Sequence, residues 1–203
     1  MSNPTWLKPD TSTPSAHEPL PVGTYVAEIL GAKNVDDKYL TIQMDVSEGD
    51  YKGYYTADFN AKKNNPKVTK PYYAGTLNLF FPKGDGSERD GWTISAFNKA
   101  IGAIEMSNNG YHFDFDKPAM LKGKKVGIAV REYNGYNDNT GKTFKNTEIG
   151  VLIDVEYART GKMKPLKPKY SKNYPLEDVD NTSPVNIVPG AVIVDDDEEL
   201  PFD

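Results

Sequence analysis

The chain has no cysteine among its 203 residues, which excludes disulfide bonds, thiolate metal sites and thiol catalysis. This absence also fits a reducing compartment. No apolar run approaches the roughly 18 residues that a membrane-spanning helix needs. The N-terminal stretch MSNPTWLKPDTSTPSAHEPLP has no hydrophobic signal region. We therefore expect neither secretion nor insertion into a membrane.

Residues suited to catalysis are also scarce. The two histidines are His17, in a Pro-, Ser- and Thr-rich segment, and His112, in the aromatic stretch YHFDF. Asp114 and Asp116 can ligate a cation, yet such carboxylates more often cap or solvate a loop. The motif GYNDNTGKT has five residues between its glycines, whereas a phosphate-binding loop needs four. We expect no enzyme activity, no metal and no cofactor.

The net charge of −5 conceals two regions of opposite sign. Residues 177–203 hold nine acidic residues and no Lys or Arg. Removing those nine from the 29 acidic residues leaves 20 against 24 basic ones, a net charge of +4 for residues 1–176. The sequence therefore predicts a mildly basic body and a strongly acidic tail, each favouring partners of the opposite charge.

The tail ends in DDDEELPFD, an acidic run with a small apolar tip. Like charges at this density repel one another and stay solvated, so we expect a disordered segment. A purely solubilising end is one interpretation, but the apolar tip has no use there, so we favour docking into basic pockets of other proteins. The predicted docking residues are Asp195, Asp196, Asp197, Glu198, Glu199, Leu200, Pro201, Phe202 and Asp203. The preceding VNIVPGAVIV is either an extra strand or a binding segment.

Before the tail, hydrophobic periodicity predicts several short strands. Residues 1–20 lack periodicity and indicate a flexible arm. Apolar and polar residues alternate over 22–32 and again over 40–46, as in half-buried strands. The aromatic stretch 51–59 is predicted to be extended, and 76–81 is predicted as a further strand.

A helix is predicted over 92–107, because apolar residues recur there at spacings of three and four. These residues are Ile94, Phe97, Ile101 and Ile104. Asp90 is the expected N-cap, and the sequence NNG that follows the helix is expected to end it. Two alternating strands come next, at 126–130 and 149–155. A long polar hairpin joins them, with Asn134-Gly135 and Gly141 as turn formers.

This order indicates a mainly β protein with one helix before its last two strands. An OB-fold-like Greek-key barrel over 21–157 matches it, and an open antiparallel sheet with one packed helix is the alternative. Residues 158–176 are rich in Lys and Pro and free of acidic residues. They are predicted to form a basic linker to the acidic tail at 177–203.

Many of the 13 tyrosines lie beside lysines. Cations that track phosphates and rings on which bases stack are what single-stranded nucleic acid requires. Some of these rings are instead expected in the core or in cross-strand packing. The predicted DNA-binding residues form three clusters, namely Lys52, Tyr54, Tyr55, Phe59, Lys62 and Lys63; Lys67, Lys70, Tyr72 and Tyr73; and Arg131, Tyr133, Tyr136, Lys142, Phe144 and Lys145.

The acidic run with its Pro-Phe tip resembles the C-terminal tail of bacterial and phage single-stranded DNA-binding proteins. The body is similar to a family of small phage single-stranded DNA-binding proteins in LPVGTYVAEI, EGDYKGYY and LKGKKVGIAVREYNGYNDNTGKTFKNTEI, which together span roughly 20–157. The resemblance implies an OB-fold barrel that holds DNA, and a tail that recruits replication, recombination and repair proteins. It also implies the cytoplasm of an infected bacterium.

One position departs from that family pattern. Asp203 follows Phe202, whereas the bacterial tail ends on its phenylalanine, whose free carboxylate takes part in recognition. The difference points to a phage-encoded partner in place of the host's pockets. A protein adaptor or inhibitor that never touches DNA, and whose acidic tail imitates a nucleic-acid strand, is the alternative function. Self-association and the choice between DNA and RNA stay open at this stage.

Overall fold

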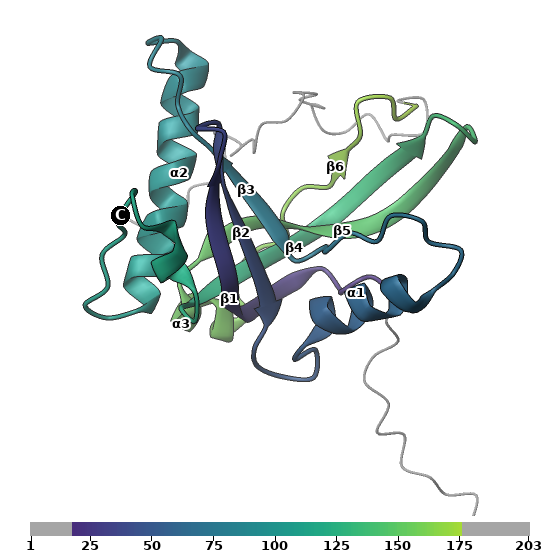
Figure 1. The fold of residues 1–203 in the computed structure, drawn as a ribbon, viewed down its shortest axis with the longest axis horizontal. Coiled ribbons are helices and arrows are strands. Elements are labelled where there is room, and N and C mark those ends of the chain that lie inside the picture. Colours follow the sequence, from purple (N-terminus) through teal and green to yellow (C-terminus); the bar gives the residue numbers. More distant parts are fainter. Residues whose placement is uncertain (1–17, 176–203) are drawn as a thin grey trace, which may run out of the picture.

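The computed structural model describes residues 18–175 of the chain. Figure 1 shows a twisted sheet with a long helix, α2, on one side and a shorter helix, α1, on the other. The elements in chain order are β1 (Gly23–Val35), β2 (Tyr39–Val46), α1 (Tyr54–Asn64), β3 (Thr76–Phe80), α2 (Glu88–Ser107), the 3-10 turn η1 (Pro118–Leu121), β4 (Lys125–Asn137), β5 (Lys142–Ile153), α3 (Val155–Thr160) and β6 (Lys169–Tyr170). The mainly β class is confirmed, although residues 18–175 contain three α-helices where one was expected.

The sheet is built around β1. Strands β3-β2-β1-β4-β5 are joined in that order, and every neighbouring pair on this path is antiparallel, as predicted. The two-residue β6 adds to β4 in parallel, which makes the six-stranded sheet mixed. Within residues 18–175 no pairing joins β3 to β5, so the sheet is not closed between them.

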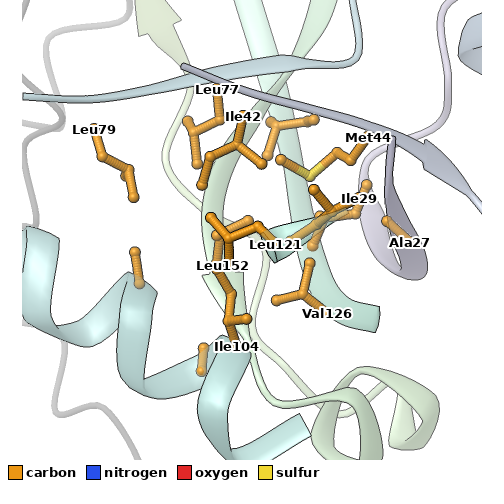
Figure 2. Close-up of a cluster of buried hydrophobic side chains, with 14 of the residues drawn as sticks. Ala27, Ile29, Ile42, Met44, Leu77, Leu79, Ile104, Leu121, Val126 and Leu152 are labelled. Atoms are coloured by element: carbon orange, nitrogen blue, oxygen red, sulfur yellow. The ribbon is translucent and has the colours of Figure 1, made fainter. Parts of the chain in front are cut away.

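The core is one buried cluster that the sheet shares with α2 and also with Tyr54 and Tyr55 of α1. Alternate residues of β2 and β4 point into it, and Ile42, Met44 and Ile128 are fully buried. Figure 2 shows Ile104 of α2 among the side chains that the strands turn inward, close to Leu152 of β5. Burying each such side chain contributes about 1.5–3 kcal/mol. The alternation in the strands and the spacing of Ile101 and Ile104 therefore identify this core correctly, whereas Ile94, predicted on the same face of the helix, is 43% exposed.

The prediction that 51–59 is extended is wrong, because α1 begins at Tyr54. Its aromatic residues favour a strand locally. Gly53, which precedes the helix, has no side chain to cap the first turn. The buried Asp45 of β2 does so instead: its carboxylate accepts hydrogen bonds from the backbone N–H groups of Tyr55 (2.9 Å) and Thr56 (3.1 Å). A contact from a neighbouring strand thus decides the local structure.

The helix α2 ends at Ser107 as predicted, but it starts at Glu88 and not at 92. Ser87 is its N-cap, since the Ser87 hydroxyl accepts from the backbone N–H of Asp90. The expected N-cap role of Asp90 is therefore wrong. The buried Asp90 carboxylate instead accepts from the backbone N–H groups of Lys83 and Gly84, and so closes the loop before the helix.

The predicted polar hairpin is formed by the ends of β4 and β5, which extend well beyond the predicted strands 126–130 and 149–155. Pairing of β4 with β5 continues beyond β1 as far as Asn137 opposite Lys142, and we call this projecting part, residues 131–148, the arm. The predicted turn at Asn134-Gly135 is wrong, because both residues lie inside β4. The turn forms where Gly141, with φ of 64°, donates its N–H to the carbonyl of Asn137.

Residues 158–175, predicted as part of a linker, pack back onto the sheet. Ala158 of α3 lies over Gly127, where an added Cβ would approach the Ala158 Cβ to 2.7 Å. Leu166 covers Gly150 of β5 in the same manner. The segment then forms β6 beside the arm. At the other end of the body, Leu20 of the expected N-terminal arm is buried in the core. None of the helices within 18–175 has the length and apolar character needed to cross a membrane.

Candidate nucleic-acid interface

The first predicted cluster surrounds α1, and two of its rings are part of the core. Tyr54 and Tyr55 are 8% and 4% exposed. The Tyr54 hydroxyl donates to the carbonyl of Glu18 at 2.6 Å. Burial, with Asp58 nearby, raises the pKa of Tyr54 to about 12, and burial also raises the pKa of Tyr55. Neither ring has a free face for a base, so these two residues leave the candidate surface.

The buried tyrosines belong to a continuous set of ring contacts that fixes α1 to the sheet. The contacting pairs are Tyr25–Tyr51, Tyr51–Tyr54, Tyr54–Tyr55, Tyr55–Tyr73 and Phe59–Tyr73, with centroids 5.3 to 6.5 Å apart. Most are edge-to-face, a favourable geometry for aromatic pairs. Tyr73 also donates to the carbonyl of Met44 at 3.2 Å. Phe59 and Tyr73 are therefore half-buried packing residues and not stacking platforms.

Tyr72 has the opposite character, because its side chain is 59% exposed. The ammonium of Lys62 lies 4.4 Å from the centre of the Tyr72 ring. Lys62 is itself held at 2.6 Å by the buried carboxylate of Asp58, one turn earlier on α1. The cation therefore covers one face of an exposed ring and is fixed there by an ion pair.

Several lysines around α1 are exposed and form no ion pair within the part of the chain that the structure describes. Three of them follow one another through the end of α1 and the loop after it, namely Lys63, Lys67 and Lys70. Lys52, in the turn before α1, is also exposed. Solvated ammonium groups with no partner are free to neutralise phosphates.

The arm divides the third predicted cluster between its two faces. The pairing places Tyr133, Phe144 and Lys142 on one face and Tyr136 and Lys145 on the other, since residues directly opposite in the pairing share a face. The rings of Tyr133 and Phe144 are 6.3 Å apart. Lys145 lies 3.5 Å from Glu132 and stays 75% exposed. The cluster is therefore not one surface.

Arg131 does not act as a free cation. Two of its guanidinium nitrogens donate to one carboxylate oxygen of Glu148 on the facing strand, at 2.9 and 3.0 Å, and its side chain is only 12% exposed. Lys169 of β6 contacts the same carboxylate at 3.1 Å, and its ammonium lies 5.9 Å from the centre of the Tyr133 ring. This group of charges joins β6 to the arm and positions Tyr133.

The surfaces of α1 and the arm lie on the same side of the molecule, opposite α2 (Figure 1). Burial raises the pKa of Tyr133, with further contributions from Glu148 and then from Tyr72. Lys62 lies over the ring of Tyr72 in the second predicted cluster, and Lys169 lies over the ring of Tyr133 in the third.

Sequence reasoning missed Lys169 and Tyr170 as members of this surface. They form β6, which pairs beside Tyr133 and Asn134 of the arm. Tyr170 also contacts Tyr174, with ring centroids 5.1 Å apart. The alternation of Lys and Tyr in KPKYSKNY could have indicated a strand with binding residues, but the neighbouring prolines favoured the prediction of a linker.

The predicted tail residues 195–203 lie outside the described residues, as do His17 and the apolar segment 185–194. Asp114 forms an ion pair with Lys117 at 3.1 Å and accepts from the backbone N–H of Asp116. No group of three or more metal-ligating side chains is found among residues 18–175. No family model matches this sequence, and no curated protein matches it either.

Proposed function

We propose that this protein binds single-stranded DNA without catalysis and with little sequence preference. The observation that carries the proposal is the succession of exposed lysines without ion pairs through the end of α1 and the loop after it, on the side of the described chain that also carries the exposed Tyr72 and the arm. Phosphates would be neutralised by Lys63, Lys67 and Lys70, and bases would stack on Tyr72 and on the rings of the arm. Every base offers a face for stacking, so the sequence of the strand should matter little.

The fold supports the same proposal at a coarser level. A five-stranded antiparallel path that is not closed, with a helix between its third and fourth strands, agrees with an OB-fold, which is a partly open barrel. Folds of this kind bind oligonucleotides on their sheet and loops. A role in phage replication, recombination or repair within the bacterial cytoplasm, with the acidic tail recruiting other proteins, completes the proposal.

The test is the binding of a fluorescein-labelled dT oligonucleotide, followed by anisotropy across a salt series. We expect affinity to fall as salt rises, with a slope of about −0.7 per neutralised phosphate. The double variant Lys67→Glu/Lys70→Glu should bind about tenfold or more weakly near 0.1 M salt, because two phosphate contacts are lost. The matched control Lys83→Glu/Lys99→Glu places the same charges near α2 and should bind as the unmodified protein does.

Two outcomes would contradict the proposal. If the unmodified protein does not change the anisotropy of the dT oligonucleotide at low salt, the alternative function is favoured, a protein adaptor whose acidic tail imitates a nucleic-acid strand. Equal losses for the two double variants would show that only net charge matters and that the lysines after α1 form no interface.

A further inference from the structure

The ring of Phe144 in the arm lies flat against the backbone of the facing strand. Its partner in the pairing is Gly135. A Cβ added at Gly135 would lie 2.1 Å from Cζ of Phe144 and 2.5 Å from both Cε1 and Cε2. Equal distances to the two Cε atoms mean that the ring sits symmetrically over the glycine. Only glycine permits this contact, because every other residue would push the ring away.

One face of Phe144 is therefore covered, and the other is open. Gly135 is buried beneath the ring, whereas Phe144 itself is 47% exposed. An exposed aromatic side chain normally samples several rotamers, and ordering it on binding costs conformational entropy. Here the contact with Gly135 and the neighbouring ring of Tyr133, 6.3 Å away, hold the ring before any ligand arrives.

The surroundings of the open face suit a nucleotide. Lys142 lies two residues before Phe144 on the same face of β5, and it is exposed without an ion pair in the described chain. Lys169 lies beyond Tyr133 on the other side. A base stacked on the ring would thus have an ammonium within reach of its phosphate.

We propose that Phe144 is a preorganised base-stacking platform, seated on Gly135 and accompanied by Lys142. The inference rests on the proposed function and specifies which ring of the arm takes a base and what holds that ring in place. Two other exposed rings, Tyr72 and Phe80, differ in kind. Tyr72 carries a lysine on one face, and Phe80, which is 41% exposed, packs at a tilt against Tyr39.

The test compares a dT oligonucleotide with an abasic oligonucleotide of equal length, which keeps the phosphates and lacks the bases. Phe144→Leu should weaken dT binding by about 5- to 150-fold, the contribution of one stacked base, and leave abasic binding unchanged. Phe144→Trp should restore dT binding because it restores a flat ring. The control Phe80→Leu, on β3, should have no effect on either strand.

Two further variants separate stacking from charge. Gly135→Ala removes neither ring nor charge, and it should weaken dT binding as Phe144→Leu does. Lys142→Ala should lower the slope of log affinity against log salt by about 0.7, whereas Phe144→Leu should leave that slope unchanged.

Equal dT affinity for Phe144→Leu and the unmodified protein would overturn the inference even if Gly135→Ala failed to fold. An equal loss on dT and abasic strands would overturn it as well, because the ring would then act through the fold. In both cases the unmodified protein still binds dT, so the proposed function survives. Absence of any dT binding by the unmodified protein would instead remove the proposed function and this inference together.

Discussion

Replacing Asp45 by asparagine tests whether a single buried carboxylate determines the structure of α1. Its two oxygens accept from the N–H groups of Tyr55 and Thr56, and it is 7% exposed. Asparagine has nearly the same shape, but its amide nitrogen would face one of these donors. The remaining amide oxygen still accepts from the other donor, so one buried N–H loses its acceptor, and we expect about 1–3 kcal/mol of lost stability.

The measurement is urea unfolding of the full-length protein, alongside the control Asp50→Asn. Asp50 lies in an exposed turn close to α1, and its replacement removes the same charge. The control should stay within about 0.5 kcal/mol of the unmodified protein. For Asp45→Asn we expect a lower urea midpoint with an unchanged slope, since the surface exposed on unfolding is the same. Identical midpoints for the two variants would refute the assignment of Asp45 as the cap of α1.

Two other stability predictions follow from particular contacts. The pKa of Glu48 lies at about 2, lowered from 4.5 chiefly by the hydrogen bond from Arg159, so its stabilisation is present above about pH 4.5 and is lost as pH falls through 2. Glu48→Gln should therefore lower the free energy of unfolding by about 1 kcal/mol at pH 7 after solvent screening, and by only a small part of that at pH 2. Glu28→Gln should cost nothing at either pH in urea titrations. Gly127→Ala should lower the free energy of unfolding by about 1–3 kcal/mol, because the new Cβ would lie 2.7 Å from Ala158 of α3. Gly102→Ala, where α2 has open space, should raise it by about 0.5–1 kcal/mol. Equal melting temperatures for the two variants would contradict both predictions.

Elements whose pattern is set by burial were predictable from the sequence. The alternating residues of β2 and the core part of β4 face the interior, and the spacing of Ile101 and Ile104 in α2 reports the same core. Elements set by a distant contact were not predictable. The stretch that forms α1 is rich in strand-forming rings, and it becomes helical because Asp45, eight residues before Gly53, caps its first turn.

The candidate site shows the same limit. Exposed lysines such as Lys67 could be recognised from composition, but the sequence does not show which rings are buried. Tyr55 and Tyr72 lie in similar Lys- and Tyr-rich stretches, yet one is in the core and the other is on the surface. In the arm, Asn134-Gly135 has the composition of a turn, whereas the glycine serves to seat Phe144 within a strand.

The packing of residues 158–175 against the sheet determines the shortest fragment of this protein that should be expressed. A fragment ending at 157, the boundary that composition suggests, would expose the buried side chains of Val26 and Ile153 to solvent. It would also remove Leu166, which covers Gly150. The same truncation would remove Lys169, which contacts the Glu148 carboxylate that also binds Arg131. Crystallisation or binding work on a trimmed protein should therefore keep every residue through 175, and a fragment cut earlier is expected to aggregate.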